Sequence, residues 1–273
     1  MALGLICSVM LTKIKNPLIA YLALMPFLGL PVLQAQRIMP PEAPSRNPAR
    51  LTVQSAVGNH PECVVLLHGL ARTPRCMGKM VAFLGGQGYD VFNIGYPSTK
   101  HNVDELTTMV FDAVHEQVSK REYRKVHFIV HSLGSILVRT HMKKSPMPNL
   151  GRVVMLAPPS KGSEVVDKLG GIFLFKWING PAGVQLGTNP ESVPSKLGPV
   201  DFECGVLTGR KSINWILSMM ISGENDGKVS VERARLPGMR DFRVLNVAHP
   251  FIMKNPEVMR LALGFLREGR FPS

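Results

Sequence analysis

Short apolar runs alternate with helical stripes along most of the chain, and this alternation constrains the fold more than any other feature. The runs are apolar at both odd and even positions, as expected of strands that a parallel sheet buries on both faces. We predict six strands, at 63–67, 90–94, 126–130, 152–156, 215–221 and 242–247. Helical periodicity lies between or after them, at 77–84, 103–120, 133–143 and 258–266. This order predicts an α/β fold with a doubly wound, mostly parallel sheet.

The composition is that of a globular protein. Hydrophobic residues make up 45% of the 273 residues and charged residues 19%, which excludes a disordered chain and a collagen-like repeat. An α/β fold of this length commonly forms one unit. We therefore predict a folded domain at 51–273, behind a leader at 1–35 and a linker at 36–50 that contains four prolines.

The first 35 residues have the order of a secretory signal peptide. Lys13 and Lys15 precede an apolar run at 18–33, which small and polar residues follow. The run is shorter than the roughly 20 residues of a membrane-spanning helix, so we expect cleavage after Ala35 and export to the periplasm or the medium. Leu33 is larger than the residue usual three positions before a cut, so an uncleaved anchor at the inner membrane is the alternative.

Basic residues outnumber acidic ones. The net charge is +13 for the whole chain and +11 once the two leader lysines are removed. A basic surface favours peripheral contact with an anionic membrane surface, and scattered solubilising charge is the alternative explanation. No run of five or more Lys and Arg residues occurs, which argues against a nucleic-acid partner.

Three cysteines follow the leader, at Cys63, Cys76 and Cys204. An oxidising compartment would permit one disulfide and one remaining thiol, and the sequence does not choose the pair. None of the three lies in a CxxC motif or beside a histidine cluster at metal-ligand spacing. We therefore expect no metal site and no cofactor.

Residues 160–211 break the alternation of strands and helices. The segment contains Gly170 and Gly171, four prolines and three aromatic residues close together. We predict a small cap or lid insertion. Phe173, Phe175 and Trp177 are expected to form either the insertion's own small core or the apolar wall of a substrate pocket.

A serine follows the third predicted strand and directly precedes a helix. The sequence there is His-Ser-Leu-Gly-Ser at 131–135. A sharp strand-to-helix turn can raise such a serine hydroxyl above the sheet, as in the nucleophile elbow with the pattern G-x-S-x-G. Gly134 fits this pattern, whereas Val130 occupies the first glycine position. We predict Ser132 as a nucleophile, and a helix N-cap is its alternative role.

A serine nucleophile needs a histidine base and an acid that orients the base. In this type of fold the acid and then the histidine come after the serine in the chain. Asp226 lies in a turn after the predicted strand 215–221 and is our candidate acid, with Glu224 as its competitor. His249 is our candidate base, because it follows the last predicted strand and no other histidine lies beyond Asp226.

The same chemistry needs two backbone N–H groups that stabilise an oxyanion. One belongs to the residue after the nucleophile, Leu133, and the other comes from a loop after an earlier strand. The loop that follows the strand at 63–67 offers Leu70, with Ala71 as an alternative one residue further on. His68 and His131 are expected to orient loops.

The chain resembles the lipase and esterase branch of the α/β-hydrolase superfamily in four motifs. They are HGL at 68–70, HSLG at 131–134, NDGKVSVE at 225–232 and AHPF at 248–251. Further stretches, among them VVLLHGLART, NIGYPST, VVMLAPP and GSEVVDKLGG, are similar to proteobacterial hydrolases described as lipase-like or as related to the inositol deacylase PGAP1. The likeness covers roughly residues 60–270 and implies this fold and a Ser-Asp-His triad.

These features predict a serine hydrolase that cleaves carboxylic esters of apolar acyl groups through an acyl-enzyme on Ser132. The substrate would be a small-molecule or lipid ester. Two alternatives remain: an acyltransferase that uses the same triad, and a binding protein that keeps the fold without its chemistry. The triad alone does not separate hydrolysis from acyl transfer.

Overall fold

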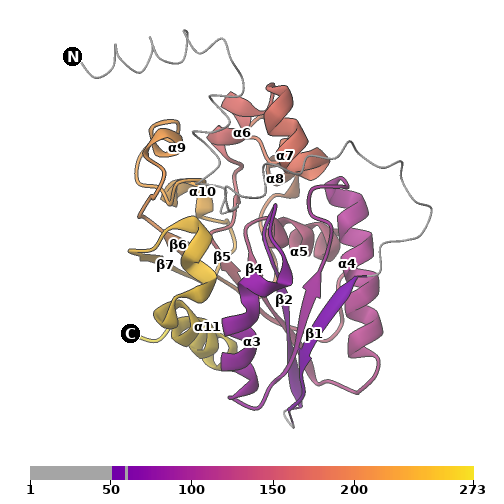
Figure 1. Cartoon of the computed structure of the whole chain (residues 1–273). Coiled ribbons are helices and arrows are strands. Elements are labelled where there is room, and N and C mark those ends of the chain that lie inside the picture. Colours follow the sequence, from indigo (N-terminus) through magenta and orange to yellow (C-terminus); the bar gives the residue numbers. More distant parts are fainter. Residues whose placement is uncertain (1–50, 59–60) are drawn as a thin grey trace, which may run out of the picture. The chain divides into compact units, whose positions relative to one another are not determined.

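The computed structural model of the protein describes residues 51–58 and 61–273, in which seven strands form one sheet of order β1-β3-β2-β4-β5-β6-β7 (Figure 1). The predicted signal peptide at 1–35 and the linker at 36–50 lie outside the described residues. The strands are β1 (Thr52–Ala56), β2 (Glu62–Leu67), β3 (Asp90–Gly95), β4 (Lys125–His131), β5 (Leu150–Leu156), β6 (Cys204–Gly209) and β7 (Asp241–Leu245). The mostly parallel α/β sheet expected from the sequence is therefore confirmed.

The strand register brings the carboxyl ends of the central strands to one edge of the sheet. β1 pairs antiparallel with β3, and every other neighbouring pair is parallel. Pairing places Ile94, Leu67, Val130, Met155 and Val206 in one row across the sheet. The loops after these residues therefore meet at the edge where such sheets bind ligands.

Helices cover both faces of the sheet (Figure 1). α4 (Val103–Val118) and α5 (Leu133–Lys144) pack on one face, and α3 (Gly78–Gly85) and α11 (Pro256–Glu268) pack on the other. The strands are apolar at both parities because each face is buried under a helix layer. In β2, for example, Val65 and Leu67 enter the core below α4 and α5, whereas Val64 and Leu66 enter the core below α3 and α11.

Shorter helices gather near the carboxyl edge of the sheet. Figure 1 shows α6 (Glu164–Leu169), α7 (Phe173–Val184) and α9 (Trp215–Met219) at that end. The other short elements are η3 (Pro74–Met77), α8 (Val193–Leu197), α10 (Val231–Ala234) and η4 (His249–Lys254). No helix in the described part of the chain is long and apolar enough to cross a membrane.

Five of the six predicted strands are confirmed to within two residues at each end, and the prediction at 215–221 is wrong. This segment contains the short helix α9, which begins at the N-cap Asn214, whose side chain accepts a hydrogen bond from Leu217 N. The sixth parallel strand is instead β6, which lies inside the segment 160–211 that we predicted as a cap. The last residues of that segment therefore belong to the sheet. The edge strand β1 was not predicted.

The three cysteines of the folded part are free thiols. Cys63 lies on β2 and Cys204 on β6, with β4 and β5 between them, a separation of roughly 14 Å at the usual strand spacing. No disulfide can join these two strands. Burial raises the pKa of each of these two thiols to about 12, so both remain protonated and unreactive.

Candidate active site

Ser132 lies at a sharp turn between β4 and α5. Its φ of 51° and ψ of −114° are far from the allowed regions of an L-residue, and its side chain does not cap the helix. Such strain persists only where the surrounding structure enforces it, and it is typical of functional sites. The predicted strand, turn and helix around Ser132 are present, and the alternative role as an N-cap is not fulfilled.

Close packing explains the glycines near this turn. A Cβ atom on Gly134 would lie 2.9 Å from Leu67 Cβ and 3.0 Å from Leu67 O, so α5 can approach β2 only with glycine there. A Cβ atom on Gly69 would lie 3.1 Å from Ser132 Cβ, which places the loop after β2 directly against the serine. Val130, at the first glycine position of the pattern, is fully buried in the core below α4 and α5.

Asp226 and His249 form a buried pair. His249 Nδ1 lies 2.7 Å from Asp226 Oδ2, and the two side chains are 4% and 0% exposed. Asp226 Oδ1 accepts hydrogen bonds of 2.9 Å from the backbone N–H groups of Lys228 and Val229. Because Nδ1 donates to the carboxylate, the lone pair of His249 is on Nε2. Glu224 is exposed and has no part in this pair.

His131 lies next to His249 at this edge of the sheet. The His131 ring, on the residue before Ser132, lies 4.8 Å from the His249 ring between centroids. Burial lowers the pKa of His131 well below its usual value, and the nearby positive charges of Arg72 and Lys228 lower it further. His131 is therefore neutral. Within the described part of the chain, the Ser132 hydroxyl makes no hydrogen bond to the His249 ring, and catalytic hydrogen bonds of this kind often tighten only in the substrate complex.

The loop after β2 offers a backbone N–H group at Leu70. Within residues 51–58 and 61–273, neither Leu70 N nor Leu133 N has a hydrogen-bond acceptor. The alternative donor, Ala71 N, already donates to Ser98 Oγ at 3.1 Å. This hydrogen bond leaves Leu70 rather than Ala71 as the free donor beside Ser132.

His68 holds this loop in place. Its Nδ1 donates to Gly69 O at 2.9 Å, its Nε2 accepts from Tyr96 N at 3.3 Å, and its ring stacks on Tyr96 at 4.1 Å. Burial lowers the pKa of His68 to about 4, so the ring is neutral and can both donate and accept. Tyr96 and Ser98 were assigned no role from the sequence, although they directly follow the strand β3 and so belong to the same sheet edge.

Backbone strain is concentrated at this edge of the sheet. In the described residues, three residues other than glycine have positive φ: Ala71 at 52°, Ser132 at 51° and Ala157 at 48°. They follow β2, β4 and β5, which are neighbours in the sheet. Three adjacent strand ends with enforced backbone geometry mark this edge as the candidate active site.

Comparison with known proteins identifies the fold. Neither a protein-family model nor a curated protein matches the sequence. The mature lipase BlEst2 of Bacillus licheniformis is 20% identical, with a TM-score of 0.63 over 79% of this chain and 98% of that chain. A monoacylglycerol lipase of Paleococcus ferrophilus is 17% identical, with a TM-score of 0.55 over 81% and 99%. The phospholipase PlaB of Legionella pneumophila is 22% identical, with a TM-score of 0.54 over 64% and 45%.

These matches agree with the mostly parallel sheet and its flanking helices. The chain has the α/β-hydrolase fold. At such low identity the likeness concerns the fold, and it supports the lipase- and esterase-like resemblance at that level. The finer resemblance to hydrolases related to PGAP1 stays a prediction.

The segment between β5 and β6, which we predicted as a cap or lid insertion and call the insertion below, packs against the loops after β2 and β3. A Cβ atom on Gly183 would lie 3.1 Å from Leu70 Cδ2, and Gly180, at a φ of 65°, packs against Thr99 O. Ala182 N also donates to His101 O at 3.1 Å. The second half of α7 therefore contacts both the loop after β2 and the loop after β3.

The three aromatic residues predicted to line a pocket lie on the first half of α7. Phe173 is 80% exposed and Trp177 is 52% exposed, whereas Phe175 is half-buried. This exposure is incompatible with the alternative that the three form a small core of the insertion. Their role in substrate binding stays a prediction.

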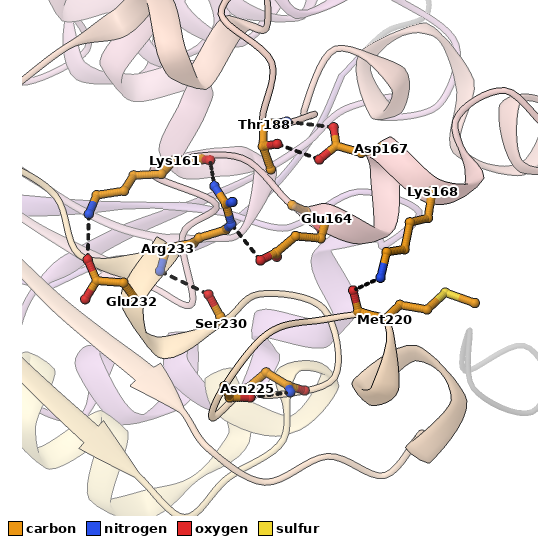
Figure 2. Close-up of polar contacts among 12 residues, drawn as sticks. Lys161, Glu164, Asp167, Lys168, Thr188, Met220, Asn225, Ser230, Glu232 and Arg233 are labelled. Carbon is orange, nitrogen blue, oxygen red and sulfur yellow. Dashed lines mark hydrogen bonds and ion pairs between the residues drawn. The ribbon is translucent and has the colours of Figure 1, made fainter. Parts of the chain in front are cut away.

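Polar contacts fasten the insertion to the loop that carries Asp226 (Figure 2). Arg233, on α10, donates to Lys161 O at 2.9 Å and pairs with Glu164 at 2.8 Å. Ser163 Oγ donates to Lys228 O at 2.7 Å. Figure 2 also shows Lys168 on α6 donating to Met220 O, a 2.8 Å hydrogen bond. The position of the acid loop thus depends on the insertion.

A recess of about 800 Å³ lies at the opposite edge of the sheet. It is lined by residues at the amino ends of β2, β4 and β5, with Glu62, His127 and Arg152 among them. Several of its charged groups are paired: His127 Nε2 lies 3.1 Å from Glu62, and Arg152 pairs with Glu203 at 2.6 Å. The recess contains none of the predicted catalytic residues.

Proposed function

We propose that the protein is a serine hydrolase that cleaves carboxylic esters through an acyl-enzyme on Ser132. The observation that carries this proposal is the buried hydrogen bond between His249 and Asp226 beside a strained serine. A buried carboxylate that holds a histidine through Nδ1 leaves Nε2 as a base. The hydroxyl that this base serves belongs to Ser132, at the end of β4 on the same edge of the sheet.

The proposed reaction has two halves. Ser132 Oγ attacks the ester carbonyl while His249 Nε2 takes the hydroxyl proton, and the oxyanion that forms accepts hydrogen bonds from Leu70 N and Leu133 N. The tetrahedral intermediate collapses, and His249 returns the proton to the departing alcohol. A water molecule then attacks the acyl-enzyme by the same steps, which releases the acid and restores the serine.

Asp226 keeps the imidazole in the required tautomer and stabilises its protonated form. Its two backbone hydrogen bonds, from Lys228 N and Val229 N, fix the carboxylate without neutralising it. The hydrogen bond between Ser132 and His249 forms when substrate is bound, as in other hydrolases whose catalytic contacts tighten on binding.

The proposed substrates have apolar acyl groups. Exposed apolar side chains lie on α7, on α9 with the loop before it, and on η4, at Phe173, Trp177, Ile213, Trp215, Met219 and Phe251. Large exposed apolar residues that gather near a site suit contact with lipid. The solved structures with the same fold include a lipase and a phospholipase. We therefore propose lipid esters as substrates and an anionic membrane surface as their source.

Turnover of 4-nitrophenyl esters with acyl chains from two to sixteen carbons tests the proposal. We expect hydrolysis by the purified protein, with higher kcat/KM for longer chains. Ser132→Ala should abolish it. Ser145→Ala, an exposed serine at the other end of α5, is the matched control and should retain full activity. Activity that survives in Ser132→Ala would refute the proposal.

A further inference from the structure

Two cations without acceptors lie near Ser132, on two different loops. Arg72 follows Leu70 by two residues in the loop after β2, and Lys228 follows Asp226 by two residues. Both residues are partly buried. Within the described ranges neither side chain makes a hydrogen bond or an ion pair.

The loops that carry Arg72 and Lys228 meet at His131. A Cβ atom on Gly69 would lie 2.7 Å from His131 Nδ1, and the His131 ring lies 4.8 Å from the ring of His249, which is hydrogen bonded to Asp226. The two cations therefore lie on loops packed around this histidine. Both lower the pKa of His131, the residue before Ser132. Burial, together with repulsion from Arg72, lowers the pKa of Lys228 to about 8. The two loops therefore hold like charges near one another in a partly desolvated place, an arrangement that costs free energy unless an anion is bound.

Asp226 does not supply that anion. Its Oδ2 is hydrogen bonded to His249, and its Oδ1 accepts from two backbone N–H groups. The attraction of Asp226 for Lys228 is weaker than the effects of burial and of Arg72 on the pKa of this lysine.

Two cations of the segment between β5 and β6 and of α10 are paired with carboxylates, unlike Arg72 and Lys228. In Figure 2, Lys161 pairs with Glu232 at 2.7 Å and Arg233 pairs with Glu164 at 2.8 Å. The chain thus provides carboxylates for the cations that fasten the insertion. Arg72 and Lys228, on the loops beside Ser132, have no carboxylate partner in the described residues.

We infer that Arg72 and Lys228 form an anion-binding subsite beside Ser132, and that the preferred substrates are esters with a phosphate or carboxylate group close to the scissile carbonyl. The inference rests on the proposed function and narrows its substrate class. A guanidinium group binds two oxygens of a phosphate or carboxylate at once, and an ammonium group adds a point charge. Partly buried cations bind such anions more strongly than exposed ones.

Two pairs of esters that differ only in the anion test the inference. The first pair is mono-4-nitrophenyl adipate and 4-nitrophenyl hexanoate, in which a carboxylate replaces a methyl group. The second is dihexanoyl phosphatidic acid and dihexanoylglycerol, which tests phosphate. The readout is the ratio of kcat/KM for the anionic ester to that for its neutral partner.

We expect this ratio to fall about tenfold in Arg72→Gln and in Lys228→Met for at least one of the two ester pairs. In the wild-type protein the same ratio should fall as the salt concentration rises, because salt screens the charges. Lys228→Arg should retain most of the preference because it keeps the charge. Lys79→Met, at an exposed lysine on α3, is the matched control and should leave the ratio unchanged. A distorted fold would lower both rates, so the ratio reports on the charge.

The outcomes separate this inference from the proposed function. If the neutral esters are hydrolysed and both ratios are the same in wild type, Arg72→Gln and Lys228→Met, the anion subsite is refuted while ester hydrolysis stands. If the folded wild-type protein hydrolyses no ester of either pair, the proposed function itself fails. A ratio that Lys79→Met lowers as much as Lys228→Met would also refute the subsite, because net charge alone would explain it.

Discussion

At the residue scale, the geometry of the site depends on a backbone that glycine packing enforces. Ser132 keeps a strained φ of 51° because α5 is held against β2 at Gly134. Strain of this kind costs of order 1–3 kcal/mol and is kept only where the surrounding fold over-determines it. The hydroxyl of Ser132 is thereby fixed beside the loop that carries Leu70.

Substitutions at His249 and Asp226 separate the roles of the proposed base and of the acid that orients it. We expect His249→Ala to lower kcat by about 10⁶-fold and Asp226→Asn by about 10⁴-fold, because the base is lost in the first and only its tautomer and orientation in the second. Steady-state kinetics on a 4-nitrophenyl ester measures both. Glu224→Gln is the matched control for the acid and should keep wild-type kcat, since Glu224 is exposed. Full activity in Asp226→Asn would exclude Asp226 as the residue that orients the catalytic histidine.

At the scale of the elements, a buried arginine joins the insertion to the sheet layers. Arg139, on α5, donates to Gly198 O at 2.8 Å and to Ser160 O at 3.2 Å, which lie at the two ends of the insertion. Burial lowers the pKa of this guanidinium to about 10, so it stays charged at neutral pH. One side chain thus holds both ends of the segment that packs over the site.

Removing the guanidinium group of Arg139 should destabilise the fold. Arg139→Met leaves buried carbonyl groups without a donor, and we expect a loss of about 2–4 kcal/mol in the free energy of unfolding. Urea denaturation followed by circular dichroism measures the loss. Lys79→Met, which removes an exposed charge, should change stability by no more than about 0.5 kcal/mol. An equal effect of the two substitutions would show that Arg139 does not hold the insertion.

Elements with strong periodicity could be predicted from the sequence, and β6 and α9 show why others could not. A short apolar run fits a strand or a buried helix equally well, and the run at 215–221 was assigned to the wrong one. β6 contains Gly205, and glycine weakens a strand signal. In the fold this glycine is required, because a Cβ atom there would lie 2.6 Å from Phe265 and 2.7 Å from Phe271. The contacts that require Gly205 come from α11 and from Phe271 beyond it, far away in sequence, so no local signal explains a glycine in this strand.

The candidate site residues are predicted from their order along the chain, which does not require every element between them to be right. Asp226 follows from its turn and its position after Ser132, although the strand predicted before it is wrong. His249 follows from its place after the last predicted strand, with no other histidine beyond Asp226. Arg72 and Lys228 had no local signal, since only the fold brings their two loops to the same edge of the sheet.

At the scale of the whole molecule, buried histidines make stability depend on pH. Burial lowers the pKa of His68 and of His141 to about 4, whereas an unfolded chain binds a proton on each near pH 6.5. Between these values the unfolded state holds more protons, so the free energy of unfolding falls as pH drops from 6.5 to 4. His68 alone contributes up to about 1.4 kcal/mol per pH unit. Urea denaturation at pH 7.0, 5.5 and 4.5 should show this loss, and equal stability at all three would contradict it.

Cleavage of the predicted leader at 1–35 can be tested separately on the whole chain. Expression of residues 1–273 in a Gram-negative host should give a periplasmic protein that begins at Gln36, because the apolar run at 18–33 is too short to remain as an anchor. Intact-mass spectrometry of the periplasmic and membrane fractions measures this. A version that begins at residue 36 is the control and should stay in the cytoplasm. Full-length protein in the membrane fraction would establish the anchor instead.

The account as a whole depends on Ser132 being an activated nucleophile. Reaction of the folded protein with a fluorophosphonate, followed by mass spectrometry of its peptides, measures this most directly. We predict a single adduct on Ser132, greatly slowed in His249→Ala and absent in Ser132→Ala. Folded protein that forms no adduct, or forms it on another serine, would contradict the account.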